Sequence, residues 1–70
     1  MPMIEITVNG NISKLDAPTS INEFLVIKGF EGRSVAVAIN SIVIRRTSFD
    51  NTIINDGDVV EIVRPVGGGV

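Results

Sequence analysis

Residues 3–10 read Met-Ile-Glu-Ile-Thr-Val-Asn-Gly, and this stretch decides how the chain begins to fold. Its side chains alternate between two faces, which is the period-two pattern of a strand with one buried face. The residues expected to face the core are Ile4, Ile6 and Val8. Asn9-Gly10 then favours a two-residue hairpin turn, because both residues tolerate positive φ angles. The stretch therefore predicts a strand followed by a tight antiparallel return.

A helix is predicted to begin at Ser20. Ser20 and Glu23 have the spacing of a capping box, in which serine is the N-cap and glutamate occupies position N3. Apolar residues then recur at helical spacing and predict a buried stripe of Ile21, Phe24 and Leu25. Gly29 stands where a helix C-terminus favours a left-handed residue. Phe30 is expected to fold back onto the core.

Three other segments before residue 45 read as strands, at residues 11–16, 34–40 and 42–44. In the first of them, either Ile12 or Leu15 faces the core. In the second, the alternation points Val35, Val37 and Ile39 toward the core. The small residues Ala36 and Ala38 then point outward.

The last part of the chain contains one more strand. Residues 45–55 read as irregular, with Phe49 and either Ile53 or Ile54 holding them to the core. Asp56-Gly57-Asp58 reads as a turn. The strand after it spans residues 59–63, and its predicted core residues are Val60 and Ile62.

This order of elements predicts an α+β fold. A hairpin, a helix and then further strands give a ββαββ-type mixed sheet with one main helix packed on one face. The first and last strands then lie side by side and parallel. That arrangement is the β-grasp, or ubiquitin-like, architecture. Residues 1–64 are expected to form this domain, and residues 65–70 are expected to form a flexible Gly-rich tail.

Two apolar surfaces are expected to remain uncovered. The first is the free face of the sheet, which reads equally as a docking surface or as ordinary surface. Its expected residues are Met3, Thr7, Ala36, Ala38, Val59 and Val63. The second is formed by Val26 and Ile27, which fall off the buried stripe of the helix. Their spacing favours an apolar face tucked under a loop over a binding role.

Composition excludes several classes of function. Seventy residues form one domain, and the absence of cysteine and histidine removes disulfides, thiolate metal sites and the commonest general base. We therefore expect no metal site and no independent enzyme. A net charge of -2 argues against nucleic-acid binding. No stretch resembles a signal peptide or a membrane span, so the expected location is cytoplasmic.

The chain ends in Arg64-Pro65-Val66-Gly67-Gly68-Gly69-Val70. Glycine loses the most conformational freedom on ordering, so such a tail adds nothing to a core. It can, however, be threaded without side chains through a narrow channel into the active site of another protein. The terminal carboxylate then becomes the candidate reactive group. The competing interpretation is a frayed terminus.

At this point the chain resembles the ThiS family of sulfur carriers along nearly its whole length. The resemblance rests on Ile6-Thr7-Val8-Asn9-Gly10, on the Ser20-capped helix and on Val37-Ala38-Ile39-Asn40. It includes Val43 followed by Arg46 and Phe49. Its most specific part runs from Asp56-Gly57-Asp58 through the last strand into Val66-Gly67-Gly68-Gly69. Two residues depart from the family pattern, Lys28 in the helix and Val70 after the glycines.

The resemblance implies a reaction performed on this protein by others. A ThiF-like activating enzyme would use ATP to adenylate the carboxylate of the terminal glycine, and a persulfide donor would convert it to a thiocarboxylate. A ThiG-like thiazole synthase would accept the sulfur. The carrier itself binds no cofactor. The reactive residue is Gly69 if Val70 is removed, with Gly68 as the alternative terminus and Val66 and Gly67 in the tail.

The resemblance also suggests where partners would dock, namely at Val59, Val63 and Arg64. Arg64 can be grouped with Arg45 and Arg46 as an electrostatic contact for the activating enzyme. The competing interpretation is that these three arginines are solvated surface cations, since exposed ion pairs contribute little.

Alternative functions remain open on the same fold. One is a molybdopterin-type sulfur carrier, and another is a ubiquitin-like modifier. A third, from a different class, is a non-catalytic β-grasp interaction module that uses no chemistry at its tail. Such a module would keep its binding when the last three residues are removed, whereas a carrier would lose its function.

Overall fold

The N-terminal hairpin forms as its sequence predicts. The computed structural model describes residues 3–30 and 34–64, and in it β1 (Ile4–Val8) pairs antiparallel with β2 (Asn11–Leu15). Asn9 and Gly10 turn the chain at φ angles of 49° and 86°. Because the turn has only two residues, Val8 pairs with Asn11 and the register is fixed. Leu15 is therefore buried and Ile12 is 68% exposed, so Leu15 is the residue of β2 that faces the core.

Helix α1 (Ile21–Ile27) has the predicted caps. The Ser20 Oγ accepts a hydrogen bond from the Glu23 N–H at 3.2 Å. At the other end, Gly29 adopts a φ of 85°, and its N–H donates to the Val26 carbonyl at 3.1 Å. The Phe30 N–H donates to the Leu25 carbonyl at 2.8 Å, which completes a Schellman motif. Phe30 packs against the core, as predicted.

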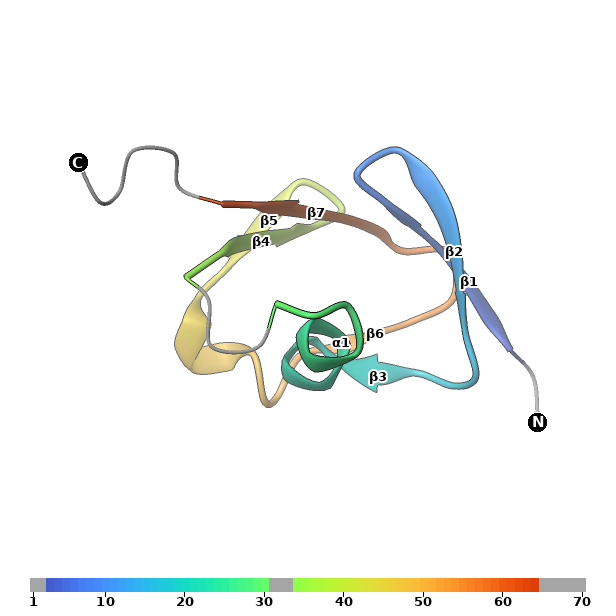
Figure 1. The fold of residues 1–70 in the computed structure, drawn as a ribbon, viewed down its shortest axis with the longest axis horizontal. Coiled ribbons are helices and arrows are strands. Elements are labelled where there is room, and N and C mark those ends of the chain that lie inside the picture. Colours follow the sequence, from blue (N-terminus) through green and yellow to red (C-terminus); the bar gives the residue numbers. More distant parts are fainter. Residues whose placement is uncertain (1–2, 31–33, 65–70) are drawn as a thin grey trace.

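The strands assemble into one mixed sheet with the order β2-β1-β7-β4-β5. Its later members are β4 (Ala36–Ile39), β5 (Ile42–Ile44) and β7 (Val59–Val63). Strands β1 and β7 are parallel neighbours at the centre, and the other pairs are antiparallel. Figure 1 shows α1 packed against one face of this sheet. The predicted β-grasp architecture is thus confirmed.

The prediction that residues 45–55 are irregular is partly wrong. A short 3₁₀ helix, η1 (Arg46–Ser48), is followed by β6 (Ile53–Ile54), which pairs antiparallel with β3 (Thr19–Ser20). The Ile21 N–H also donates to the Thr52 carbonyl at 3.0 Å, so this small sheet is joined to the start of α1. Two-residue strands have no readable periodicity, which explains the error. Ile54 is buried and Ile53 is 45% exposed.

The core lies between the sheet and α1 and contains only apolar side chains among the described residues. It comprises Ile4, Ile6, Leu15, Ile21, Phe24, Leu25, Val35, Val37, Ile39, Phe49, Ile54, Val60 and Ile62. Strands β1, β4 and β7 contribute every second residue to it, so the odd-numbered positions of β1 and β7 face the opposite side of the sheet. No helix in the described part of the chain is long and apolar enough to cross a membrane.

Candidate functional site

The candidate site is built around β7, the strand that leads into the glycine tail. Val60 and Ile62 are buried, while Val59 and Val63 are 43% and 58% exposed on the outer face. This alternation confirms the predicted faces of the strand. Arg64, directly after the strand, is exposed and its guanidinium lies over the Phe30 ring, 5.6 Å from the centroid.

The start of β7 is fixed by the Asp56-Gly57-Asp58 turn. The Asp56 carboxylate accepts a hydrogen bond from the Glu5 N–H at 2.8 Å, and the Gly57 N–H donates to the Glu5 carbonyl at 2.8 Å. The Asp58 carboxylate accepts from the Asn55 N–H at 2.8 Å, which closes the turn. Gly57 has a φ of 87°, a conformation that favours glycine. The motif that gave the strongest family resemblance therefore docks the start of β7 against β1.

The outer face of the sheet carries apolar and small side chains on several strands, interrupted by the charged residues Glu5, Lys14 and Glu61. Ile12, Thr7 and Val59 lie side by side across β2, β1 and β7. Further along β7, Glu61 pairs with Ala38, which pairs in turn with Val43, and Val63 pairs with Ala36. All the residues predicted for this face are exposed or half-buried. We define the outer face by Thr7, Ile12, Ala36, Ala38, Val43, Val59, Glu61 and Val63.

Sequence reasoning missed two members of the outer face. The sequence leaves Ile12 as an alternative core residue and indicates no face for Val43, yet these side chains are 68% and 74% exposed. The two-residue turn at Asn9-Gly10 contained the signal for Ile12. It pairs Val8 with Asn11, so Ile12 must lie opposite Thr7 on the outer side.

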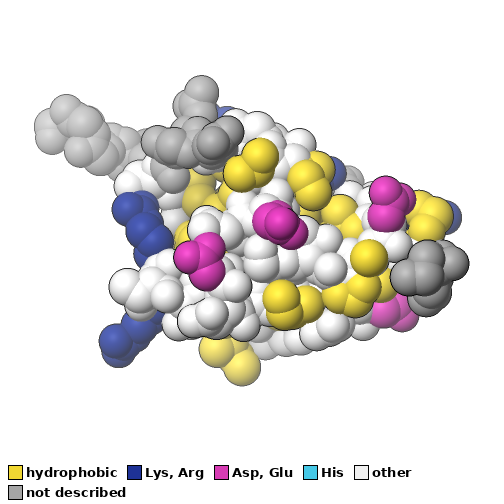
Figure 2. Space-filling view, turned by 90° about the horizontal axis from the view of Figure 1, so that it is seen from below, with side chains coloured by type: hydrophobic (Ala, Val, Ile, Leu, Met, Phe, Trp, Pro, Cys, Tyr) yellow, Lys and Arg dark blue, Asp and Glu magenta, His cyan; other side chains and the backbone are white. Residues whose placement is uncertain are grey.

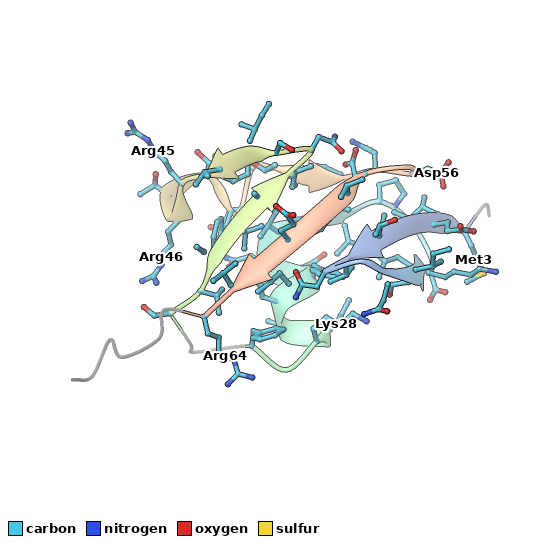
Figure 3. The ribbon with its side chains drawn as sticks, turned by 90° about the horizontal axis from the view of Figure 1, so that it is seen from above. Met3, Lys28, Arg45, Arg46, Asp56 and Arg64 are labelled. Carbon is cyan, nitrogen blue, oxygen red and sulfur yellow. The ribbon has the colours of Figure 1, made fainter. Side chains whose placement is uncertain are left out.

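Three arginines lie at the end of the molecule where β7 finishes. Figure 3, which looks onto the outer face, shows Arg45, Arg46 and Arg64 at this end and Met3 and Asp56 at the other. The Arg46 guanidinium donates to the Ser34 Oγ at 2.8 Å. Two of the three arginines thus have partners within the chain, and Arg45 is exposed at the start of η1.

The predicted reactive residues lie outside the described residues. These are Gly69 and Gly68, together with Val66, Gly67 and the trailing Val70. The structure therefore defines the body to which the tail is attached, up to Arg64. Within residues 3–30 and 34–64, no cluster of three side chains could hold a metal ion.

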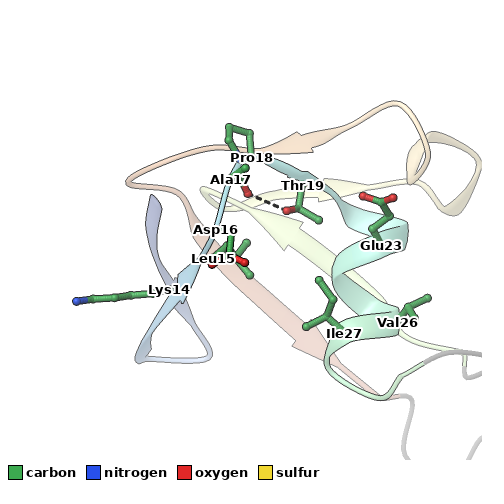
Figure 4. Close-up of a pocket in the computed structure, with 9 residues that line it drawn as sticks. All are labelled: Lys14, Leu15, Asp16, Ala17, Pro18, Thr19, Glu23, Val26 and Ile27. Carbon is green, nitrogen blue, oxygen red and sulfur yellow. Dashed lines mark hydrogen bonds between the residues drawn. The ribbon is translucent and has the colours of Figure 1, made fainter. Parts of the chain in front are cut away.

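The opposite side of the molecule, around α1, contains a groove of about 700 Å³. Figure 4 shows it between the end of β2, the segment Asp16–Pro18 and α1, where Val26 and Ile27 contribute apolar surface. These two side chains are 53% and 62% exposed, so no segment within the described residues covers them, contrary to the prediction of an apolar face tucked under a loop. Figure 2 shows that hydrophobic and acidic side chains are mixed over this side.

Comparison with known proteins agrees with this architecture. The ThiS family model matches residues 4–69. The uncharacterized protein ycf40 of Pyropia yezoensis is 36% identical over 66 residues, which cover 94% of this chain and 93% of that protein. The crystal structure of the thiamine biosynthesis protein ThiS from Geobacter metallireducens has a TM-score of 0.81 at 36% identity, covering 94% of this chain and 100% of that one.

A longer relative also matches. The thiazole synthase of Paramagnetospirillum magneticum is 32% identical over 66 residues, which are 94% of this chain but only 20% of that protein. That synthase therefore contains, within a much longer chain, a stretch similar to nearly all of this one.

Proposed function

This chain belongs to the ThiS family, and on that premise we propose that it carries sulfur for thiamin biosynthesis as a thiocarboxylate on its C-terminal glycine. The observation that carries the proposal is the extent of the family match, which runs from β1 through the glycine tail and ends at Gly69. This end point supports Gly69 as the reactive terminus, with Val70 removed beforehand.

The proposed reaction needs little from the carrier itself. A partner enzyme transfers AMP from ATP to the Gly69 carboxylate and releases pyrophosphate, because a free carboxylate is a poor electrophile. The terminal sulfur of a persulfide then attacks the acyl carbon and displaces AMP, and a thiol cleaves the resulting acyl disulfide to leave the thiocarboxylate. The carrier contributes an unbranched terminus and a surface that positions it, and it binds no cofactor.

The outer face is the proposed docking surface for both partners. Its residues are apolar apart from Thr7 and Glu61, it extends along β7 to Val63, and Arg64 follows it immediately. A partner bound there would sit directly beside the start of the tail. The similarity between this chain and part of a thiazole synthase supports a synthase of that class as the sulfur acceptor.

The proposal is tested by incubating the chain with an adenylating enzyme of the ThiF type, ATP and a persulfide donor, and then measuring its intact mass. Three forms are compared, namely the full-length chain, a chain ending at Gly69 and a chain ending at Gly68. We expect one oxygen to be exchanged for sulfur in the form ending at Gly69. The sulfur should then pass to a thiazole synthase when the two proteins are mixed.

Other outcomes would identify the alternatives. Sulfur transfer to a molybdopterin synthase subunit, with none to a thiazole synthase, would indicate the molybdopterin-type carrier. Linkage of the glycine to lysines of other proteins would indicate a modifier. If none of the three forms reacts, and partner binding survives removal of the last three residues, the chain is an interaction module.

The docking surface is tested with isosteric substitutions. Val59→Thr combined with Val63→Thr keeps the branched shape that strands favour but replaces a methyl group by a hydroxyl group on each residue. We expect the KM of the activating enzyme for the carrier to rise several-fold. The free energy of unfolding should change by less than about 0.5 kcal/mol, because both sites are exposed. Val26→Thr, at a similarly exposed site on α1, is the matched control and should leave KM unchanged. Equal effects at both sites would contradict docking on the outer face.

A further inference from the structure

Strand β1 leaves β7 before β7 ends, and this leaves a gap in the hydrogen bonding of the last strand. Along the parallel pair, the Thr7 N–H donates to the Asp58 carbonyl at 3.0 Å, and the Asn9 N–H donates to the Val60 carbonyl at 2.9 Å. The next bonds would need the Asn9 carbonyl as acceptor for the Ile62 N–H, and then a main-chain N–H beyond Asn9. Asn9, however, has a φ of 49° and turns the chain away into the hairpin.

The Asn9 side chain closes this gap. Its Oδ1 accepts a hydrogen bond from the Ile62 N–H at 2.9 Å, and its Nδ2 donates to the Ile62 carbonyl at 3.2 Å. A side-chain amide has the same donor and acceptor as a peptide unit. It therefore takes the place of the main-chain groups that a longer β1 would have offered. The contact joins residues 53 positions apart in the sequence.

Among the described residues, no other strand offers hydrogen bonds to the main-chain groups of Ile62. In an antiparallel pair, successive residues point their main-chain groups alternately toward and away from the partner strand. The Val59 carbonyl accepts from the Asn40 N–H at 2.8 Å, so Val59, Glu61 and Val63 face β4. Ile62 then faces the side from which β1 has departed, and both its hydrogen bonds there are part-buried.

We propose that Asn9 is a positioning residue for the carrier reaction, because it holds β7 in the sheet up to Ile62 and so fixes the point from which the tail starts. This inference rests on the proposed function. It accounts for Asn9 in the motif Val8-Asn9-Gly10, for which the hairpin turn alone would require only tolerance of a positive φ.

The position of this starting point matters for the reaction. The partner must bind the outer face and the glycine carboxylate at the same time. If β7 loosens at Ile62 and Val63, the stretch of chain between the sheet and the glycine carboxylate lengthens by two residues, or about 7 Å when extended. The additional residues must then be ordered in each productive complex, which disfavours that complex entropically. Docking on the remaining outer face would be affected far less.

The chain supplies a matched control for this role in Asn40. Asn40 also begins a two-residue turn at a positive φ, 52°, and its Oδ1 accepts from the Val59 N–H at 3.0 Å. It therefore secures the same strand at the end far from the tail. Glycine tolerates both backbone conformations, so Asn9→Gly and Asn40→Gly each remove the side-chain bonds without straining the turn.

The experiment compares these two variants with the unaltered chain, using whichever terminus the preceding experiment finds to be active. Hydrogen exchange gives the structural result. Asn9→Gly should speed exchange of the Ile62 N–H, and Asn40→Gly should speed exchange of the Val59 N–H. The kinetic result is the rate of ATP-dependent adenylation by the activating enzyme, followed as pyrophosphate release.

We expect Asn9→Gly to lower kcat by about thirtyfold, the effect of ordering two additional residues. Its inhibition constant, as a competitor of the unaltered chain, should stay within about twofold, because the outer face is retained. Asn40→Gly should change neither quantity. This division between kcat and binding distinguishes positioning from a general loss of stability.

Two results would overturn the inference while leaving the proposed function intact. In the first, the unaltered chain and Asn9→Gly are adenylated at equal rates. In the second, Asn9→Gly and Asn40→Gly lose activity equally, in step with their stability. If the unaltered chain itself is not adenylated in any form, the proposed function fails and the role of Asn9 in the reaction fails with it.

Discussion

Two hairpin turns lie on either side of β7, and each begins with an asparagine at a positive φ angle. The two asparagines secure different ends of the strand. The turn at Asn9-Gly10 has φ angles of 49° and 86°, and the turn at Asn40-Ser41 has φ angles of 52° and 71°. Each asparagine places its Oδ1 on a main-chain N–H of β7. Asn40 bonds to Val59, where the strand begins, and Asn9 bonds to Ile62, near its end.

The two turns also differ in the second hydrogen bond that each asparagine side chain makes. The Asn9 Nδ2 donates to the Ile62 carbonyl at a part-buried site, whereas the Asn40 Nδ2 donates to the Asp58 carboxylate at an exposed site, 3.1 Å away. The comparison shows that an asparagine at a turn can extend the ladder of a neighbouring strand by one peptide unit. Which end of that strand it secures depends on where its own strand stops.

The largest expected effect tests whether the buried side chain of Ile62, rather than Asn9, holds the tail end of β7. Ile62→Ala removes a side chain that is only 7% exposed but keeps both bonds from Asn9. We expect a loss of about 2–5 kcal/mol in the free energy of unfolding by urea, because a cavity is left in the core. Hydrogen exchange at the main-chain N–H of residue 62 should still be slower in this variant than in Asn9→Gly, once each exchange rate is corrected for the global stability of its variant.

The next effect compares the two asparagines directly. Asn9→Gly loses two part-buried hydrogen bonds to the main chain, and we expect it to lower the free energy of unfolding by about 1–3 kcal/mol. Asn40→Gly loses bonds at an exposed site and should cost about 0.5–1.5 kcal/mol. Urea denaturation of both variants measures this order, and a larger loss for Asn40→Gly would contradict it.

Substitution by aspartate separates the two environments through pH. In Asn9→Asp, the neutral carboxyl can donate to the Ile62 carbonyl, whereas the ionised form places negative charge against that oxygen. The pKa of the introduced carboxyl should therefore rise above its ordinary value of about 3.9 in the folded state. Its stabilising contribution is present below that ordinary value and is lost as the pH rises through the folded pKa.

Salt provides the control for the aspartate variants. In Asn40→Asp, the introduced carboxyl faces the Asp58 carboxylate at an exposed site, so repulsion there should be screened by added salt. The loss in Asn9→Asp, about 1 kcal/mol at neutral pH, arises against a carbonyl dipole at a part-buried site and should respond little to salt. Thermal unfolding at low and high ionic strength distinguishes the two, and an equal salt response would show that the sites are not different.

The smallest effect concerns the second residue of each turn. Ser41 adopts a φ of 71°, which disfavours side chains other than glycine, whereas Gly10 adopts its φ of 86° without strain. We expect Ser41→Gly to stabilise the fold by about 0.5 kcal/mol and Gly10→Ser to destabilise it by about 1 kcal/mol. A Cβ at Gly10 would meet no atom within 4 Å, so the second change reports on the backbone alone. Thermal unfolding of both variants should show shifts of opposite sign.

Much of the fold and of the outer face follows from local patterns in the sequence. The alternation in β1 and β7, the Ser20 cap and the Gly29 terminus each depend on residues a few positions apart, so they can be read without knowing the partner strands. The pairing of β3 with β6 could not be read in this way, because two residues have no periodicity and their partner lies more than thirty positions away.

The sequence by itself determined the turns at residues 9–10 and 56–58, the buried faces of β1, β4 and β7, the position of α1 and the run of glycines near the end of the chain. These features depend on φ preferences and side-chain periods that act over neighbouring residues. Only the tertiary structure decided that Ile54 rather than Ile53 is buried, and that the Asn9 amide serves Ile62. Ile54 is placed by the pairing of β6 with β3. The Asn9 contact requires β7 to lie beside β1, which brings together residues from opposite ends of the chain.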